Sequence, residues 1–139
     1  MRYAVVNAAL RSGDSRLLEH NRTEIDAIDV GLTDLPIYHG LVERGTDLSQ
    51  EQAARYVPGK IVTEHSFLST SQESRETFPG NTHFYITSKN GRDVSEWSAV
   101  PQEKEVLFQR GTQFEVRANL LDQNSGERII VLREINRKE

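Results

Sequence analysis

The chain has 139 residues, of which 36% are apolar, and a formal net charge of −4. This length fits one domain with a modest core, and the charge gives no general attraction to nucleic acid or anionic lipid. Cysteine is absent, which excludes disulfides and thiolate metal sites. The sequence holds no apolar run as long as a membrane span, and its start lacks the core of a signal peptide. We therefore expect one soluble domain over residues 1–139.

The N-terminal part, residues 1–34, is expected to be helical. Apolar residues recur there at helical spacing around Val6 and again around Ile28. Thr23 is a suitable N-cap for the later helix, and Gly31 is typical of a helix end. This part shows no cluster of titratable residues, so we interpret it as scaffold.

The remainder, residues 35–135, is expected to form a β-rich core, because short runs of β-branched and aromatic residues alternate with turn residues. We expect strands at 35–41, 61–63, 67–71, 83–87, 101–108, 114–121 and 129–132. A capping box at Ser49 predicts a short helix between the first two strands. Asn90-Gly91 predicts a turn, followed by an exposed loop over 92–101 that carries Trp97. Helices followed by strands indicate an α+β fold.

The strand expected at 101–108 carries acidic residues ahead of an apolar end. Side chains alternate along a strand, so Glu103 and Glu105 are expected on one face, roughly 7 Å apart, with Lys104 opposite. Two like charges at that distance oppose each other's ionisation, and a purely structural face avoids them. Taken alone, the pair fits the solvated start of a strand better than a site. The neighbouring motifs reverse that preference.

Three small hydroxyl residues, Ser69, Thr70 and Ser71, directly follow an apolar pair. Hydroxyls at the end of a buried strand need hydrogen-bond partners, and a carboxylate is a good one. A turn capped by serine and threonine explains the same residues equally well. In the polar segment that follows, Arg75 and Phe78 are the residues suited to grip a ligand.

Taken together, three blocks resemble the mono-ADP-ribosyltransferases of the arginine–serine–glutamate class, which includes bacterial toxins and vertebrate ecto-enzymes. The blocks are Ile37–Leu41, then Tyr56–Thr63 leading to Phe67–Ser71, then Glu103–Phe108 before Gly111-Thr112. They occur in the family order within residues 25–134. The resemblance implies N-terminal helices followed by two packed, mostly antiparallel β-sheets around an NAD cleft. It also implies an NAD-dependent ADP-ribosyltransferase, a glycosyltransferase that uses NAD as co-substrate and no metal.

The resemblance assigns roles to individual residues. Glu105 is the catalytic carboxylate near the ribose, and the hydroxyl of Ser69 fixes its orientation. Glu103 takes the proton that an arginine acceptor must lose, and Trp97 contacts that acceptor. The residues implied in NAD binding are His39, Gly40, Ser69, Thr70, Ser71, Arg75 and Phe78.

One block departs from the family pattern. The family block normally ends Tyr-Arg-Gly, whereas the corresponding place is here taken as Tyr38-His39-Gly40. Arginine offers a fixed charge and a planar fork, which histidine does not reproduce at neutral pH. A related class, resembling diphtheria toxin, holds the adenosine ribose with a histidine on this strand. By that analogy His39 is assigned to contact NAD.

The acceptor and the biological setting follow from the resemblance alone. A protein arginine is favoured as acceptor because Glu103 is present, and nucleic acid is the alternative. The resemblance implies a toxin or effector domain of a secreted protein, delivered to the cytoplasm of a target cell, with a cognate immunity protein as a further partner and no membrane association.

Other functions stay open beside this one. The alternatives are a weak or inactive module that binds NAD or a partner protein, and an NAD glycohydrolase. An inverting glycosidase fits less well, because two acids on one strand face cannot flank a sugar. A metal site is not indicated, since the four histidines show no ligand spacing.

Overall fold

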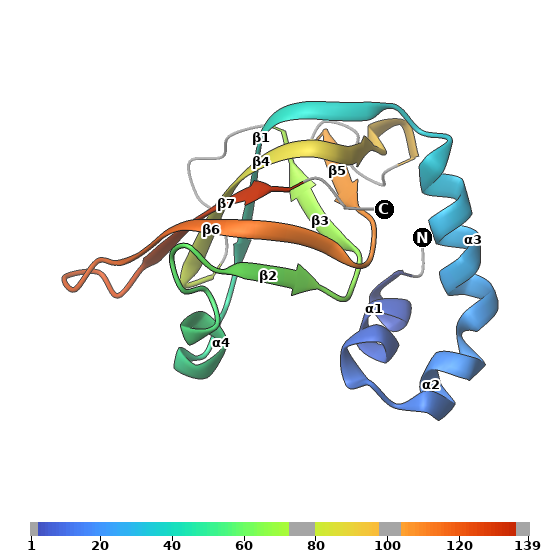
Figure 1. Cartoon of the computed structure of the whole chain (residues 1–139), viewed down its shortest axis with the longest axis horizontal. Coiled ribbons are helices and arrows are strands. Elements are labelled where there is room, and N and C mark those ends of the chain that lie inside the picture. Colours follow the sequence, from blue (N-terminus) through green and yellow to red (C-terminus); the bar gives the residue numbers. More distant parts are fainter. Residues whose placement is uncertain (1–2, 73–79, 98–103, 136–139) are drawn as a thin grey trace.

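The computed structural model describes residues 3–72, 80–97 and 104–135, without the side chains of residues 3–5 and 97. The helices are α1 (Tyr3–Ser12), α2 (Ser15–His20), α3 (Arg22–Thr33), α4 (Gln50–Ala54) and the short 3-10 helix η1 (Ser95–Trp97). The strands are β1 (Ile37–Thr46), β2 (Ile61–Glu64), β3 (Leu68–Ser71), β4 (Thr82–Asp93), β5 (Glu105–Phe108), β6 (Thr112–Leu121) and β7 (Arg128–Glu134). The α+β class expected from the sequence is confirmed (Figure 1). Among the described helices, none combines the length and apolar character of a membrane span.

Helix α3 starts and ends differently from the prediction. Its N-cap is Asn21 rather than Thr23, because the carbonyl of Asn21 accepts the first helical hydrogen bond, from the backbone N–H of Ile25 (3.0 Å). The helix also continues past Gly31 to Thr33. Burial of Leu32, which is 1% exposed, favours this extra turn.

The seven strands form one connected sheet in the order β1-β3-β5-β4-β7-β6-β2, and β1 also pairs with β4. All pairings are antiparallel except β4–β7, which is parallel. The two expected sheets are thus joined, because β1 and β4 pair with strands on both sides. Buried apolar side chains from six strands form the main core: Val42, Leu68, Phe84, Ile86, Val106, Phe108, Phe114, Val116, Ile130 and Leu132.

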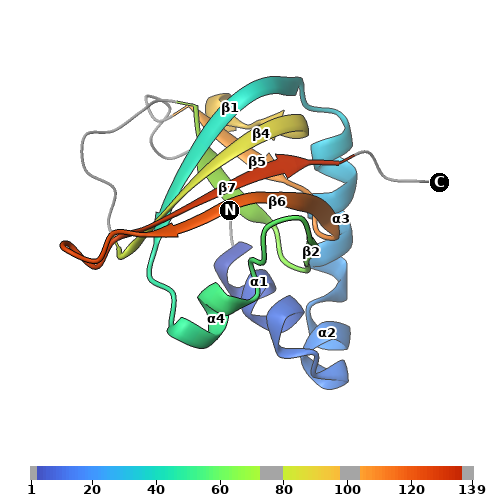
Figure 2. The same cartoon turned by 60° about the vertical axis from the view of Figure 1, so that its left-hand side comes forward.

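A second apolar cluster holds the N-terminal helices against the sheet. Helices α1–α3 lie along one side of the sheet, whereas the turn between β6 and β7 projects at the other end (Figures 1 and 2). Val6, Ile25 and Leu32 of α1 and α3 pack with Phe67, Val94 and Leu107 in this cluster. Because side chains alternate along β5, Leu107 faces the helices while its neighbours Val106 and Phe108 face the main core.

Strand β4 is longer than predicted and passes through the expected turn at Asn90-Gly91. Gly91 pairs with Tyr38 of β1, and Arg92 pairs with Leu107 of β5. A Cβ atom on Gly91 would lie 2.6 Å from Cγ1 of Val106, so this glycine allows close packing in the core. The dipeptide Asn90-Gly91 is typical of turns. Its place inside a strand, with Gly91 packed against Val106, is seen only in the structure.

Strand β5 begins at Glu105, later than the strand predicted at 101–108. Lys104 has a φ of 48° and is the one non-glycine residue in the described ranges with a positive φ. This left-handed residue interrupts the alternation of side chains. The shared face expected for Glu103 and Glu105 therefore does not follow from strand geometry, and Glu103 itself lies outside the described residues.

Candidate active site

The pairing of β3 with β5 brings Ser69 and Glu105 together. Ser71 lies opposite Glu105 and Ser69 opposite Leu107, so these four side chains share one face of the strand pair. On that face the hydroxyl of Ser69 donates a hydrogen bond to the Oε2 atom of Glu105. The two residues expected at the centre of the site are therefore in direct contact.

Thr70 lies on the opposite face of β3, towards the main core. It is 5% exposed, and its hydroxyl donates to the backbone carbonyl of Val106 (2.8 Å). Ser69 and Ser71 therefore lie on the same face as Glu105, whereas Thr70 lies on the opposite face. Of the three hydroxyl residues, the middle one fastens β3 to β5.

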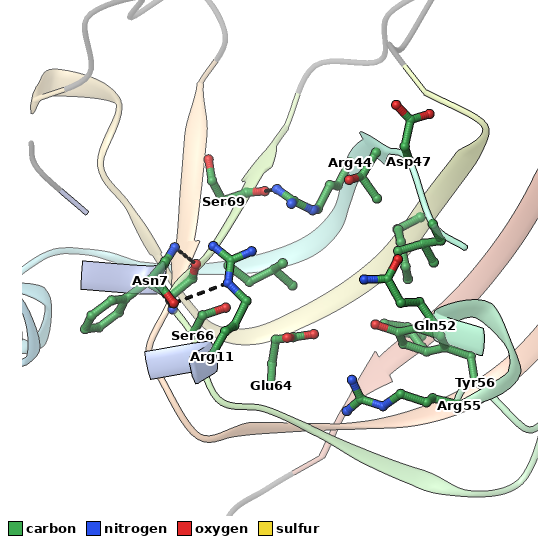
Figure 3. Close-up of a pocket in the computed structure, with 16 residues that line it drawn as sticks. Asn7, Arg11, Arg44, Asp47, Gln52, Arg55, Tyr56, Glu64, Ser66 and Ser69 are labelled. Atoms are coloured by element: carbon green, nitrogen blue, oxygen red, sulfur yellow. Dashed lines mark hydrogen bonds between the residues drawn. The ribbon is translucent and has the colours of Figure 1, made fainter. Parts of the chain in front are cut away.

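A cavity of about 500 Å³ opens beside Ser69 (Figure 3). Segments from α1, β1, α4, β2 and β3 meet in its wall. The charged lining residues are Arg11, Arg44, Asp47, Arg55 and Glu64. Guanidinium groups bind phosphate oxygens through paired hydrogen bonds. The arginines of the lining therefore offer contacts for an anionic group beside Ser69.

Arg44 connects this cavity to the Ser69–Glu105 pair. It lies near the end of β1, and its guanidinium donates to the backbone carbonyl of Ser69 (3.0 Å; Figure 3). Sequence reasoning missed this residue. The signal was present, because Arg44-Gly45 repeats the arginine–glycine pair of the family block, with Glu43 before it.

His39 and Gly40 lie at the other end of β1, and neither lines the cavity. The strand register shifts between Tyr38 and Gly40, so that His39 lies opposite two residues of β4, Lys89 and Asn90, and the side chain of His39 is exposed. The structure does not bring these two residues to Glu105. The histidine–glycine pair resembled the family block because it also follows a tyrosine within an apolar strand.

Helix α1 supplies part of the cavity wall, although the sequence indicated only scaffold. The side chain of Asn7 is buried, donates to the carbonyl of Phe67 (2.7 Å) and accepts from its N–H (2.7 Å). Arg11, one turn later, donates through Nε to the carbonyl of Asn7 (3.2 Å) and reaches the cavity (Figure 3). Helical periodicity predicts the apolar face of α1 and cannot predict what its polar face meets.

Tyr56 closes the cavity from the side of α4. Its ring contacts Phe84 edge-on, with centroids 5.3 Å apart. Burial and, to a lesser degree, the negative charge of Glu64 raise the pKa of Tyr56 to about 12. Tyr56 is therefore a neutral hydroxyl at physiological pH, beside the carboxylate of Glu64 in a cavity wall that also holds arginines.

The segment after Arg44 is held in place by Gly80 and Asn81. A Cβ atom on Gly80 would lie 2.4 Å from the backbone of Thr46, so this contact requires glycine. The side chain of Asn81 accepts from the N–H of Leu48 (3.0 Å) and donates to its carbonyl (3.1 Å). These contacts fix the end of β1, where Arg44 enters the cavity.

The remaining sequence predictions concern residues that the structure does not describe in full. Arg75, Phe78 and Glu103 lie outside the described residues, and Trp97 is described only as the last residue of η1. Among the described side chains, no three histidine, aspartate or glutamate residues gather as metal ligands. The expectation that the protein uses no metal stays a prediction.

Comparison with known proteins identifies the class. The family model described as ADP-ribosyltransferase exoenzyme matches residues 1–138. The chain is 41% identical over 132 residues to a candidate NAD(+)–arginine ADP-ribosyltransferase, Mav, of Mycobacterium avium (strain 104), and covers 16% of that protein. It is 32% identical over 133 residues to the NAD(+)–protein-arginine ADP-ribosyltransferase Tre1 of Serratia proteamaculans (strain 568), and covers 29% of it. These matches span 92% and 96% of the chain.

A solved structure agrees with these relatives. The ADP-ribosyltransferase HopU1 of Pseudomonas syringae pv. Tomato DC3000 superposes with a TM-score of 0.79 at 26% identity, covering 96% of the chain and 65% of HopU1. The fold is therefore that of the ADP-ribosyltransferases. The chain belongs to the ADP-ribosyltransferase exoenzyme family, as the resemblance in the sequence predicted. It spans less than a third of the length of each of the two relatives described here.

Proposed function

We propose that the protein transfers a single ADP-ribose group from NAD to an arginine side chain of a protein. The observation that carries this proposal is the hydrogen bond to Glu105 from Ser69, a residue that lines a cavity together with three arginines. Family membership and the names of the two relatives support the same activity. A glycohydrolase or an inactive NAD-binding module is the alternative, and the experiment below distinguishes them.

In this proposal Glu105 acts on the ribose that carries nicotinamide. When nicotinamide leaves as a neutral ring, positive charge develops on the sugar, and a fixed carboxylate stabilises that charge. The hydrogen bond from Ser69 fixes the orientation of the Glu105 carboxylate. An arginine acceptor, whose pKa exceeds about 12, must lose a proton as its nitrogen bonds to the sugar. Glu103 is the proposed base for that proton.

We assign the NAD-binding arginine of the class to Arg44, in place of the role first given to His39. Arg44 contacts the Ser69 backbone and lines the cavity, and its guanidinium has the fixed charge that a diphosphate needs. Arg11 and Arg55 are the proposed further contacts to the phosphates. For Thr70 we propose a structural task, since its hydroxyl bonds to Val106.

A protein arginine is the proposed acceptor, and Trp97, Arg75 and Phe78 keep their proposed roles in acceptor and NAD contact. We further propose that this chain is the enzymatic part of a delivered toxin or effector that acts in the cytoplasm of a target cell. The length of the relatives and the exoenzyme description of the family support that proposal. An immunity protein as partner and a nucleic-acid acceptor rest on family resemblance alone.

The test is nicotinamide release from NAD with and without agmatine, a small guanidinium compound, followed by mass spectrometry of the product. We expect release in both cases and an ADP-ribosyl adduct on agmatine. Free ADP-ribose without an adduct would indicate a glycohydrolase. Binding of NAD without release would indicate a non-catalytic module and would overturn the proposed function.

A further inference from the structure

Asp93, the last residue of β4, holds two segments that follow different strands. Its Oδ1 atom accepts hydrogen bonds from the N–H (3.0 Å) and the hydroxyl (2.6 Å) of Ser95, in the first turn after β4. Its Oδ2 atom accepts from the side-chain amide of Gln72 (3.2 Å), the first residue after β3. One carboxylate therefore joins the end of the Ser-Thr-Ser strand to the start of η1.

The two segments joined by Asp93 also grip the backbone at Glu105. The N–H of Gln72 donates to the carbonyl of Lys104 (3.0 Å), and the N–H of Val94 donates to the carbonyl of Glu105 (3.0 Å). The carbonyl of Lys104 is thus held by the segment after β3, and the carbonyl of Glu105 by the segment after β4. Each fixing N–H belongs either to a partner of Asp93 or to its chain neighbour.

The backbone at Lys104 needs such support. A left-handed conformation is unfavourable for a residue with a long side chain, and it persists only where the surroundings impose it. The hydrogen bond from Gln72 holds the carbonyl of Lys104 in this conformation. If it relaxed to an extended conformation, the start of β5 would turn, and the carboxylate of Glu105 would turn with it.

The carboxyl group of Asp93 is charged when it makes these bonds. Burial alone would raise its pKa, but the hydrogen bonds from Ser95 and Gln72 and the positive charge of Lys104 outweigh burial. The pKa of Asp93 therefore lies below its usual value. Hydrogen bonds to an ionised acceptor are about twice as strong as those between neutral groups.

We propose that Asp93 is a positioning residue of the active site, which fixes Gln72 and Ser95 and thereby the backbone that aims Glu105. This inference rests on the proposed function, because it assigns to Asp93 the task of orienting the proposed catalytic carboxylate. Asp93 itself contacts neither the Ser69 hydroxyl nor the cavity wall in any described hydrogen bond or lining contact.

A second aspartate in the chain provides a matched control. Asp122, in the turn between β6 and β7, accepts from the N–H groups of Asn124 (2.9 Å) and Ser125 (3.4 Å), and these bonds lower its pKa as well. Asp93 also accepts from the distant side chain of Gln72, whereas Asp122 shares with it the hydrogen bond from the N–H two residues later. Its position differs, because the β6–β7 turn projects away from the helices and from β5 (Figure 1).

The experiment compares Asp93→Asn with Asp122→Asn by steady-state kinetics of NAD cleavage. An amide keeps the size of the side chain, loses the charge and presents N–H groups to the donating amide of Gln72. We expect kcat for Asp93→Asn to fall about tenfold with an unchanged KM for NAD, since small displacements of a reacting group are costly. Asp122→Asn should keep both constants within about twofold. Urea midpoints of the two variants report any general loss of stability.

A compensating change separates positioning from loss of charge. In the double variant Asp93→Asn with Gln72→Glu, the new amide donates to the new carboxylate, so the link is restored with its polarity reversed. We expect kcat to return to within about threefold of wild type. If Asp93→Asn does not fold, Gln72→Ala removes the same link from the other side and should lower kcat about threefold at unchanged KM.

The outcomes are distinct. A selective fall in kcat with rescue by the double variant supports the inference. Equal kinetics of Asp93→Asn and Asp122→Asn, or a fall in kcat without rescue, overturns it and leaves the proposed function standing. Wild-type protein that cleaves no NAD overturns the proposed function and the inference with it.

Discussion

Glutamate side chains in two regions of the sheet have different hydrogen-bond partners. One region is the strand pair β3–β5, and the other comprises β4, β6 and β7. Glu134 of β7 is 3% exposed and accepts hydrogen bonds from the N–H groups of Lys89 and Asn90, both at 2.7 Å. Glu115 of β6 accepts from Arg117 (3.0 Å) and Arg133 (2.8 Å). Glu105 of β5 instead contacts a serine hydroxyl beside an open cavity.

The difference lies in what the partners can do. Glu134 accepts from backbone N–H groups of β4, and Glu115 accepts from arginines of β6 and β7. Each of these two carboxylates therefore joins strands of the sheet, which is a structural task. A hydroxyl is a weaker and more adaptable partner, because it can both donate and accept. The hydrogen bond from Ser69 thereby orients the carboxylate at β5. We infer that activity and stability are assigned to separate carboxylates, and the following variants test that separation.

The largest effect is expected for Glu105→Gln. The amide keeps the shape and removes the charge that opposes positive charge on the ribose. Both NAD hydrolysis and transfer should fall by at least about a hundredfold, the scale of losing a key electrostatic group. Nicotinamide release measures both. Activity within a few-fold of wild type would remove Glu105 from the mechanism.

The next effect distinguishes the two glutamates of the Glu-Lys-Glu segment. Glu103→Gln should reduce transfer to agmatine by about a hundredfold or more and leave hydrolysis of NAD within about tenfold of wild type. The reason is that a guanidinium acceptor needs a base to take its proton, and attack by water needs one less. Product analysis with and without agmatine measures the ratio. An equal loss of both activities would assign Glu103 to the sugar step.

A third comparison tests the assignment of the NAD-binding arginine. Arg44→Ala removes a guanidinium from the cavity and should raise the KM for NAD about tenfold or more, the scale of a lost hydrogen bond to a charged group. His39→Ala changes an exposed side chain and should leave the KM for NAD within about twofold. Steady-state kinetics at varied NAD decides between the two residues. The reverse pattern would restore His39 to the site.

Glu134→Ala should affect stability and not chemistry. It leaves the N–H groups of Lys89 and Asn90 without their acceptor at a partly buried place, which costs about 1 to 3 kcal/mol of unfolding free energy. Urea unfolding measures this loss. The kcat of the folded fraction should match wild type, and a fall in kcat that exceeds the folded fraction would contradict the separation.

The smallest effect is expected for Glu115→Gln. The hydrogen bond from Arg117 and the charge of Arg133 outweigh burial and lower the pKa of Glu115, but exposed ion pairs contribute little to stability. The urea midpoint at neutral pH should stay within the error of the measurement. Because this pKa is lowered, any contribution of Glu115 is present above about pH 4 and is lost as the pH falls below it. A clear loss of activity would contradict its structural role.

Several features of the protein were determined by short stretches of sequence. The capping box of Ser49 and Gln52 forms as predicted, because both partners lie within one helical turn. The contact of Ser69 with Glu105 was predicted through the family resemblance, and the hydrogen bond between the two residues is present. The order of the three sequence blocks predicted the family, and the match of the family model to residues 1–138 confirms it.

Other features were decided by the tertiary structure. Asn7 meets Phe67 across 60 positions of sequence, and Arg11 then reaches a cavity that no local pattern announces. Gly91 looks like a turn residue and is a packing residue, because Val106 approaches it from another strand. In each case the partner is distant in the chain, so the local pattern carries no record of it.

The choice between His39 and Arg44 as the NAD-binding residue shows most clearly what the sequence predicts and what only the tertiary structure decides. Both residues lie on β1 next to a glycine, and local sequence gives them equal standing. The sequence by itself predicted an NAD contact beside a glycine on this strand and assigned it to His39. Which end of that strand meets the cavity was decided by the pairing of β1 with β3 and by the clamp of Asn81 on Leu48. Strand periodicity determines the face of a side chain, and only packing between distant segments determines what that face encloses.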